Sequence, residues 1–97
     1  MEVRIQSVKF DADVKLTNYV QKKVEKLDRF FDGIIAAEVV LSLMPDLNNK
    51  KAAIRLEIPG YDLRAERQAK KFESAVVACV DVLKQQLKKT KEKIRGL

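Results

Sequence analysis

Four basic residues near the end of the chain could together bind a polyanion, because their spacing places them on one face of a helix. They are Lys84, Lys88, Lys91 and Arg95, at positions i, i+4, i+7 and i+11. Residues 1–63 contain ten basic and ten acidic side chains, whereas residues 64–97 contain ten basic and four acidic ones. Clustered cations repel one another unless an anionic partner or water compensates them. The net charge of +6 and the pI near 9.6 therefore favour nucleic acid or an acidic membrane surface as the partner.

The histidine and cysteine counts exclude several kinds of catalysis. The sequence has no histidine and a single cysteine, Cys79, which leaves no plausible zinc site and no histidine-based catalytic triad. No group of polar residues converges at a plausible active site. We therefore expect neither an enzyme nor a protein that needs a metal, a cofactor or a small-molecule substrate. Cys79 falls on the apolar side of its helix and is interpreted as a small buried residue.

The elements that must position the charges follow from the periodicity of the apolar residues. An alternating pattern predicts a strand over residues 2–8. Apolar residues every three or four positions then predict a helix from about Val14 to Phe31, with Gly33 placed where a left-handed residue commonly ends a helix. The period changes to two after this glycine, which predicts a second strand over residues 38–43.

The remainder of the chain predicts a meander followed by a long helix. Alternation predicts strands over residues 52–58 and 61–66, joined by the turn signal Pro59-Gly60. Helical spacing begins near Lys70 and continues over roughly seven turns. The predicted order is β-α-β-β-β-α. We expect an α+β domain with two helices packed on one face of a four-stranded sheet.

A second basic stripe lies on the first predicted helix, within about 60° of arc. Its members are Lys15, Lys22, Lys26 and Arg29. If the helices are neighbours, the two stripes border or span the groove between them and form a concave positive surface suited to a phosphate backbone. The alternative interpretation is that both stripes are solvated faces, because long helices routinely expose lysine.

Aromatic residues near these stripes have two interpretations. Tyr19 lies between the apolar stripe of the first helix and its lysines, so it either packs at the edge of the core or stacks on a base. The four phenylalanines fall on predicted apolar faces and are interpreted as core. They are Phe10, Phe30, Phe31 and Phe72.

Two strings of sequence carry a resemblance to a known family. They are YVQKKVEKLDRFFD at 19–32 and VDVLKQQLKKTKEKIRG at 80–96. Together with the length and the order of elements, they resemble the short form of the ribosome hibernation-promoting factor family, which includes ribosome-associated inhibitor protein Y. The family's D-x-L-x-x-Q-L-x-K-x-K pattern falls on Asp81, Leu83, Gln86, Leu87, Lys89 and Lys91. The string KFESAVV at 71–77 departs from the D-M-Y-A-A-I-D of many members, and the approach to it from Glu66 is about two residues longer.

The resemblance implies a partner and a mode of action. Members bind the small ribosomal subunit, through its 16S rRNA, near the decoding region, and block translation in stationary or stressed cells. Their RNA contacts come largely from basic residues of the two helices. Carried over by position, the candidate rRNA-binding residues are Lys22, Lys23, Lys26, Arg29, Lys84, Lys88, Lys89, Lys91 and Arg95. The resemblance also implies one ribosome-binding domain over residues 1–97, monomeric off the ribosome and without the C-terminal dimerisation domain of long-form members.

Two further classes of partner are alternatives to the ribosome. General double-stranded RNA binding is the alternative function, because helices packed on a sheet also occur in such domains. Membrane association through the last helix is disfavoured, because its apolar stripe continues from the core and contains no tryptophan. The opening MEVRIQSV has no signal-peptide character, and no apolar run approaches the ~20 residues needed to span a bilayer. We therefore expect cytoplasmic residence and no membrane partner.

Overall fold

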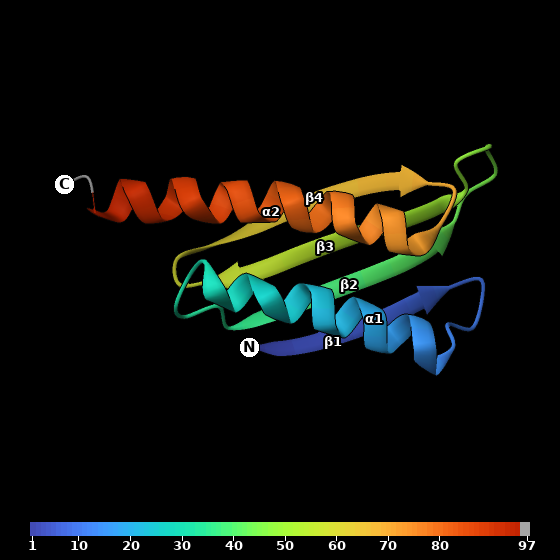
Figure 1. Cartoon of the computed structure of the whole chain (residues 1–97), viewed down its shortest axis with the longest axis horizontal. Coiled ribbons are helices and arrows are strands. Elements are labelled where there is room, and N and C mark those ends of the chain that lie inside the picture. Colours follow the sequence, from blue (N-terminus) through green and yellow to red (C-terminus); the bar gives the residue numbers. More distant parts are fainter. Residues whose placement is uncertain (96–97) are drawn as a thin grey trace.

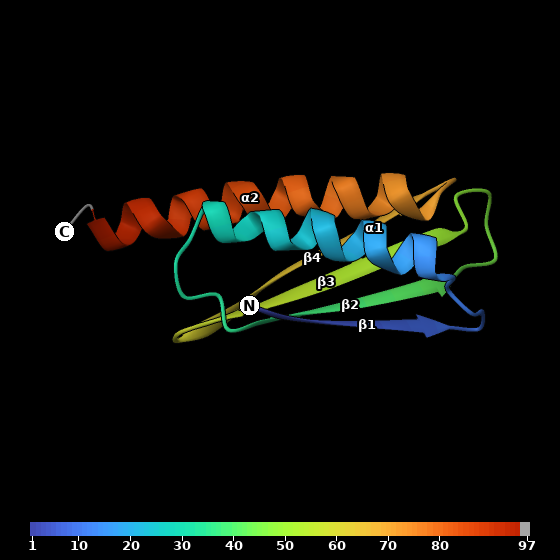
Figure 2. The ribbon, with the colours of Figure 1, turned by 60° about the horizontal axis from the view of Figure 1, so that its bottom comes forward.

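The structure is a computed structural model that describes the backbone of residues 1–95 and the side chains of residues 1–93. Its elements, in chain order, are β1 (Glu2–Val8), α1 (Val14–Glu25), the 3-10 helix η1 (Lys26–Arg29), β2 (Ala36–Leu43), β3 (Lys50–Ile58), β4 (Tyr61–Ala69) and α2 (Phe72–Arg95). Figures 1 and 2 show both helices on one face of the sheet and the other face open. The predicted α+β fold and its β-α-β-β-β-α order are confirmed.

The sheet has the strand order β1-β2-β3-β4. β1 and β2 are parallel, because α1 returns the chain across the sheet between them. β2 and β3 form one antiparallel hairpin, and β3 and β4 form another. Gly60, in the tight turn of the second hairpin, has a φ of 97°, a conformation that glycine adopts without a steric penalty. The two helices run side by side in the same direction (Figure 1).

The first helix is shorter than the periodicity predicted. The Asp13 carboxylate caps its start by accepting a hydrogen bond from the Leu16 N–H at 2.8 Å. The α-helix ends at Glu25, and η1 continues the chain to Arg29. A 3-10 helix is narrower and has three residues per turn, so it changes the direction of the last side chains relative to an α-helical stripe. The prediction that one helix reaches Phe31 is therefore wrong at its end.

The boundary between β4 and α2 also differs from the prediction. β4 continues to Ala69, three residues beyond the predicted end, because Lys50 at the start of β3 still pairs with Ala69. Exposed polar residues in this stretch conceal the alternating pattern. The last helix consequently begins at Phe72 and not near Lys70.

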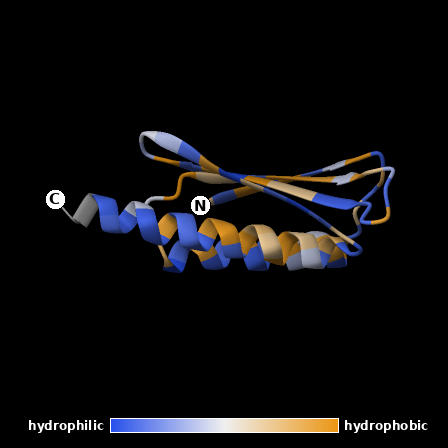
Figure 3. Cartoon of the chain, turned by 90° about the horizontal axis from the view of Figure 1, so that it is seen from above, coloured by the Kyte–Doolittle hydropathy of each residue, from blue (hydrophilic) through white to orange (hydrophobic). Residues whose placement is uncertain are grey.

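The core lies between the sheet and the helices, and Figure 3 shows the apolar helix surfaces turned toward the sheet. Cys79 is fully buried there, and its Sγ donates to the carbonyl oxygen of Ala52 at 3.3 Å. Burial raises the pKa of the Cys79 thiol to about 11, so the thiol stays protonated at neutral pH. The interpretation of Cys79 as a buried residue is confirmed. At one end of the core, the rings of Phe10 and Phe72 stack with centroids 4.7 Å apart.

The final part of α2 extends past the turn between β3 and β4 (Figure 1). The Tyr61 hydroxyl, at the start of β4, donates to Thr90 Oγ1 at 3.1 Å, and Thr90 donates in turn to the carbonyl oxygen of Gln86 at 2.9 Å. This chain of hydrogen bonds fixes the distal part of α2 to the sheet. Within the described residues, no helix is both long enough and apolar enough to cross a lipid bilayer.

Candidate nucleic-acid interface

A groove runs between α1 and α2 on the solvent side of the helical layer. It consists of two adjoining hollows that share Val77 and Asp81 of α2. Side chains spaced three or four residues apart form each wall, as the helical repeat requires. The α1 wall carries Tyr19, Lys23, Lys26 and then Phe30, just after η1. The α2 wall carries Ser74, Val77, Asp81 and Lys84.

The half of the groove nearer the helix C-termini is basic. It has a volume of about 210 Å³. Its lining is Lys23, Lys26, Arg29, Phe30, Val77, Val80, Asp81 and Lys84. The peptide dipoles of α1 give its C-terminal end a partial negative charge, which favours a cation such as Lys23 in its last turn. The fold thus brings lysine and arginine from α1, η1 and α2 together over an apolar floor.

The Phe30 ring contacts Lys84 of this lining and also Lys88, which lies one turn further along α2. The Nζ atom of Lys84 lies 4.9 Å from the centroid of the Phe30 ring, and the Nζ atom of Lys88 lies 5.6 Å from it. The negative face of an aromatic ring attracts ammonium groups, and each such contact contributes about 0.5–1 kcal/mol at an exposed site. The half-buried ring therefore holds two like charges near each other at the rim of the groove.

The interpretation of Phe30 as a core residue is incomplete. Phe30 and Phe31 are adjacent, and in the helix that the sequence predicts, adjacent residues differ by about 100° in direction, so both rings could not lie at the centre of the core. This doublet is the signal in the sequence that one of the two rings lies at a surface. Both side chains are half-buried and pack against the core at its edge.

The structure brings some of the candidate residues together and leaves others apart. Lys23, Lys26, Arg29 and Lys84 line the basic half of the groove, and Lys88 joins them above Phe30. Lys22, Lys89 and Lys91 lie outside the lining. The side chain of Arg95 lies outside the described residues. The predicted stripe on α1 contained Lys22, but Lys23 lines the groove in its place. This wall of the groove follows the row through Tyr19, Lys23 and Lys26.

Among the described side chains, the candidate cations of this region form no ion pairs with carboxylates. The eight candidates with described side chains are Lys22, Lys23, Lys26, Arg29, Lys84, Lys88, Lys89 and Lys91. Among side chains 1–93, none of the eight makes an ion pair. Unpaired charges of one sign along a groove raise the local potential and concentrate counter-ions there.

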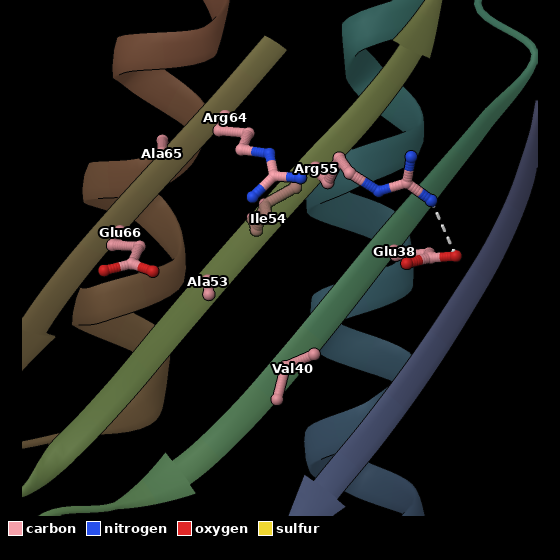
Figure 4. A pocket seen from close by; sticks show the side chains of 8 residues that line it. All are labelled: Glu38, Val40, Ala53, Ile54, Arg55, Arg64, Ala65 and Glu66. Atoms are coloured by element: carbon pink, nitrogen blue, oxygen red, sulfur yellow. Dashed lines mark ion pairs between the residues drawn. The ribbon is translucent and has the colours of Figure 1, made fainter. Parts of the chain in front are cut away.

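The open face of the sheet has a different arrangement of charge (Figure 4). Glu38 Oε1 lies 2.8 Å from a guanidinium nitrogen of Arg55 and 3.2 Å from one of Arg4. Arg55 also contacts Asp62 Oδ2 at 2.8 Å. The hydrogen bond from Arg55 holds the pKa of Glu38 below its ordinary value of 4.5, and the bonds to Glu38 and Asp62 raise the pKa of Arg55. Here basic and acidic side chains compensate each other across neighbouring strands.

A shallow hollow of about 200 Å³ lies beside this network. Val40 and Ala53 contribute apolar surface to it, and Arg64 and Glu66 lie at its β4 side (Figure 4). The paired carboxylates make this hollow a poorer anion site than the groove between the helices.

Comparisons with known proteins agree with the fold and with the resemblance. The family described as "Sigma 54 modulation protein / S30EA ribosomal protein" matches residues 3–95. The "Ribosome hibernation promoting factor" of Pseudomonas putida is 30% identical over the whole chain, which spans 93% of that relative. The "Ribosome hibernation promotion factor" of Deinococcus radiodurans is 34% identical over 78% of the chain, and the match spans 41% of that relative's length.

A solved structure shows the same architecture. The N-terminal domain of Thermus thermophilus Protein Y superimposes with a TM-score of 0.82 and 31% sequence identity. The superposition covers 93% of this chain and 99% of the Thermus domain. The two helices on a four-stranded sheet are therefore shared with this structure.

Proposed function

The chain belongs to the Sigma 54 modulation protein / S30EA ribosomal protein family, and on this premise we propose that it is a ribosome hibernation factor. Its partner is the small ribosomal subunit, which it binds through 16S rRNA near the decoding region. The names of the Pseudomonas and Deinococcus relatives support the ribosome as the partner. The proposed site of action is the cytoplasm, where the protein is monomeric when it is not on a ribosome.

One observation carries the proposal: the groove between α1 and α2 presents cations without carboxylate partners among the described side chains. A folded rRNA surface offers dense phosphates and few other charges. Lysine and arginine supply donors for these phosphates, and the bidentate geometry of arginine adds orientation. The proposed contact residues are Lys22, Lys23, Lys26, Arg29, Lys84, Lys88, Lys89, Lys91 and Arg95.

The mechanism that follows is occupancy, without a catalysed reaction. A preformed basic surface fills space that messenger and transfer RNA need, so a ribosome that carries it cannot initiate. Because the groove is built on two helices fixed to one core, little conformational entropy is lost on binding. Residues 1–97 constitute the ribosome-binding domain in this proposal. The Deinococcus factor is much longer than the region that matches this chain. We therefore propose for this chain only the activity of a ribosome-binding domain.

Charge reversal on α2 tests the proposal. We expect the Lys84→Glu, Lys88→Glu, Lys91→Glu variant to remain unbound when it is sedimented with purified small subunits. The matched control reverses three exposed lysines near the helix N-termini, Lys15, Lys70 and Lys71, where glutamate is compatible with the helix dipole. The control should sediment with the subunits as the unchanged protein does. Circular dichroism verifies that both variants fold, and continued ribosome association of the α2 variant would refute the assignment.

A translation assay distinguishes ribosome occupancy from general RNA binding. The unchanged protein should inhibit protein synthesis in a cell extract, and preloading the subunits with messenger and initiator transfer RNA should reduce its binding. An unrelated RNA duplex should compete weakly. Equal affinity for the duplex and the subunit would favour a general double-stranded RNA-binding domain instead.

A further inference from the structure

The groove between α1 and α2 changes character along its length. Beyond the basic half, the second hollow has a volume of about 370 Å³. Its lining is Tyr19, Glu73, Ser74, Val77, Ala78 and Asp81, with no lysine or arginine. A phosphate backbone is attracted to the basic half and repelled by the two carboxylates of the second half. A nucleic acid that follows the groove must therefore place an uncharged part here.

Asp81 occupies the junction, because it lines both hollows. Lys23, Lys26 and Lys84 line the basic half with it, yet Asp81 forms no ion pair among the described side chains. Its side chain is exposed. A carboxylate beside phosphate-binding lysines weakens phosphate binding unless it accepts hydrogen bonds from the ligand. The Asp81 carboxylate can thus accept hydrogen bonds from the polar edge of a ligand in the groove.

Tyr19 provides an aromatic surface in the same hollow. Its ring is half-buried, and the Nζ atom of Lys23 lies 5.5 Å from the ring centroid. Across the groove, α2 presents the small side chains of Ser74 and Ala78 together with Val77. A planar ring can enter between an aromatic wall and a wall of small residues, and bases of single-stranded RNA commonly stack on tyrosine in this way.

We propose that Tyr19 and Asp81 form a base-recognition site next to the phosphate-binding half of the groove. An unpaired base of the bound RNA packs against Tyr19, and its exocyclic amino group donates a hydrogen bond to the Asp81 carboxylate. Cytosine, adenine and guanine have this donor, whereas uracil has a carbonyl acceptor in place of the cytosine amino group and offers the carboxylate only its ring N3–H. The site therefore prefers amino-bearing bases. This inference rests on the proposed function, because it assumes that RNA occupies the groove.

Oligocytidylate and oligouridylate of equal length test the site, because they carry the same number of phosphates. We expect the protein to bind oligocytidylate about tenfold more tightly than oligouridylate, in a titration followed by NMR at low salt. In Asp81→Ala the preference should fall to near unity, chiefly because oligouridylate binds better once the negative charge is gone. Tyr19→Leu should weaken binding of both oligomers by several-fold through loss of stacking.

Glu92→Gln is the matched control for the charge. It removes one exposed carboxylate of α2 outside the groove lining, so the preference for oligocytidylate should persist. Equal binding of the two oligomers by the unchanged protein would overturn the inference. An equal gain in affinity for both oligomers in Asp81→Ala would also overturn it, because a carboxylate that only repels phosphates gives that result. Binding of an oligolysine peptide to the acidic half, in place of any base preference, would also overturn it.

Sedimentation with small subunits separates this inference from the proposed function. If Asp81→Ala still sediments with the subunits but neither protein discriminates between the oligomers, only the base-recognition site is wrong. If the unchanged protein binds neither the subunits nor the oligomers, the proposed function itself fails.

Discussion

The groove between the helices and the open face of the sheet both contain lysine and arginine, but their charges are organised in opposite ways. On the sheet, Glu38 and Asp62 neutralise Arg55 through contacts of 2.8 Å. In the groove, Lys26 and Lys84 have no carboxylate within ion-pair distance among the described side chains. The comparison shows that the number of basic residues does not identify an interface. The absence of internal compensation identifies it, because only uncompensated charge is available to an external polyanion.

The largest expected effect comes from equal neutralisation of the two regions. In the groove, the variant is Lys26→Gln, Lys84→Gln, Lys88→Gln. On the sheet, it is Arg4→Gln, Lys51→Gln, Arg55→Gln, three residues that all form ion pairs. The groove variant should lose roughly a thousandfold in affinity for small subunits, because three charged hydrogen bonds are lost at about 1.5 kcal/mol each. The sheet variant has the same net charge and should bind nearly normally in a filter-binding assay. Equal losses would show that total charge, and not its location, controls binding.

A smaller effect tests whether Phe30 organises the groove. Phe30→Leu retains an apolar side chain but removes the ring face beneath Lys84 and Lys88. We expect roughly a threefold to tenfold loss of subunit affinity, corresponding to about 1 kcal/mol for the two cation-ring contacts. Phe30→Tyr retains the ring and is the matched control, with affinity close to that of the unchanged protein. If Phe30→Leu binds as tightly as Phe30→Tyr, the ring does not position the lysines.

Stability and binding should separate at Thr90. Thr90→Val keeps the side-chain shape but removes the partner of the Tyr61 hydroxyl. The free energy of unfolding should fall by about 1 kcal/mol, measured with urea, because one partly buried hydrogen bond is lost. Subunit affinity should stay unchanged, since Phe30 holds Lys84 and Lys88 independently of this contact. A large loss of affinity would indicate that the groove depends on the anchor between α2 and the sheet.

The smallest effect concerns the pH dependence of the paired charges on the sheet. The pKa of Glu38 is lowered in the folded state, so its contribution to stability is present above about pH 4.5 and is lost as the pH falls through the lowered pKa. Glu38→Gln should therefore be less stable than the unchanged protein near neutral pH and equally stable at low pH. The contribution is small because the pair is solvent-exposed. Urea midpoints across an acid titration measure it, and a difference that grows toward low pH would contradict the network.

The order of elements was predictable from sequence because each element has its own hydrophobic period and the breaks fall at glycine, proline or polar stretches. The end of α1 was not, because an α-helix and a 3-10 helix share similar apolar spacing over one turn. The extension of β4 to Ala69 depends on its pairing with Lys50, a contact between residues distant in sequence. Such partners are invisible to a local pattern.

The candidate site was predictable in outline and not in detail. Unpaired lysines on two helices pointed to a shared groove. The choice between Lys22 and Lys23 depends on which side of α1 faces α2, and this side is set by packing against the sheet. The place of Phe30 under Lys84 was missed, since an aromatic residue next to an apolar stripe usually belongs to the core. The acidic half of the groove was also not predicted, because Asp81, Glu73 and Tyr19 line one hollow only when the helices lie side by side.

The salt dependence of binding to purified small subunits tests the central claim most directly. The logarithm of the binding constant should fall linearly with the logarithm of salt concentration, with a slope of roughly −0.7 to −0.9 for each neutralised phosphate. The groove variant should have a slope shallower by about 2 to 3 than the unchanged protein, whereas the sheet variant should keep the full slope. Identical slopes for all three proteins would contradict the account, because the unpaired cations of the groove would then not be the groups that meet the phosphates.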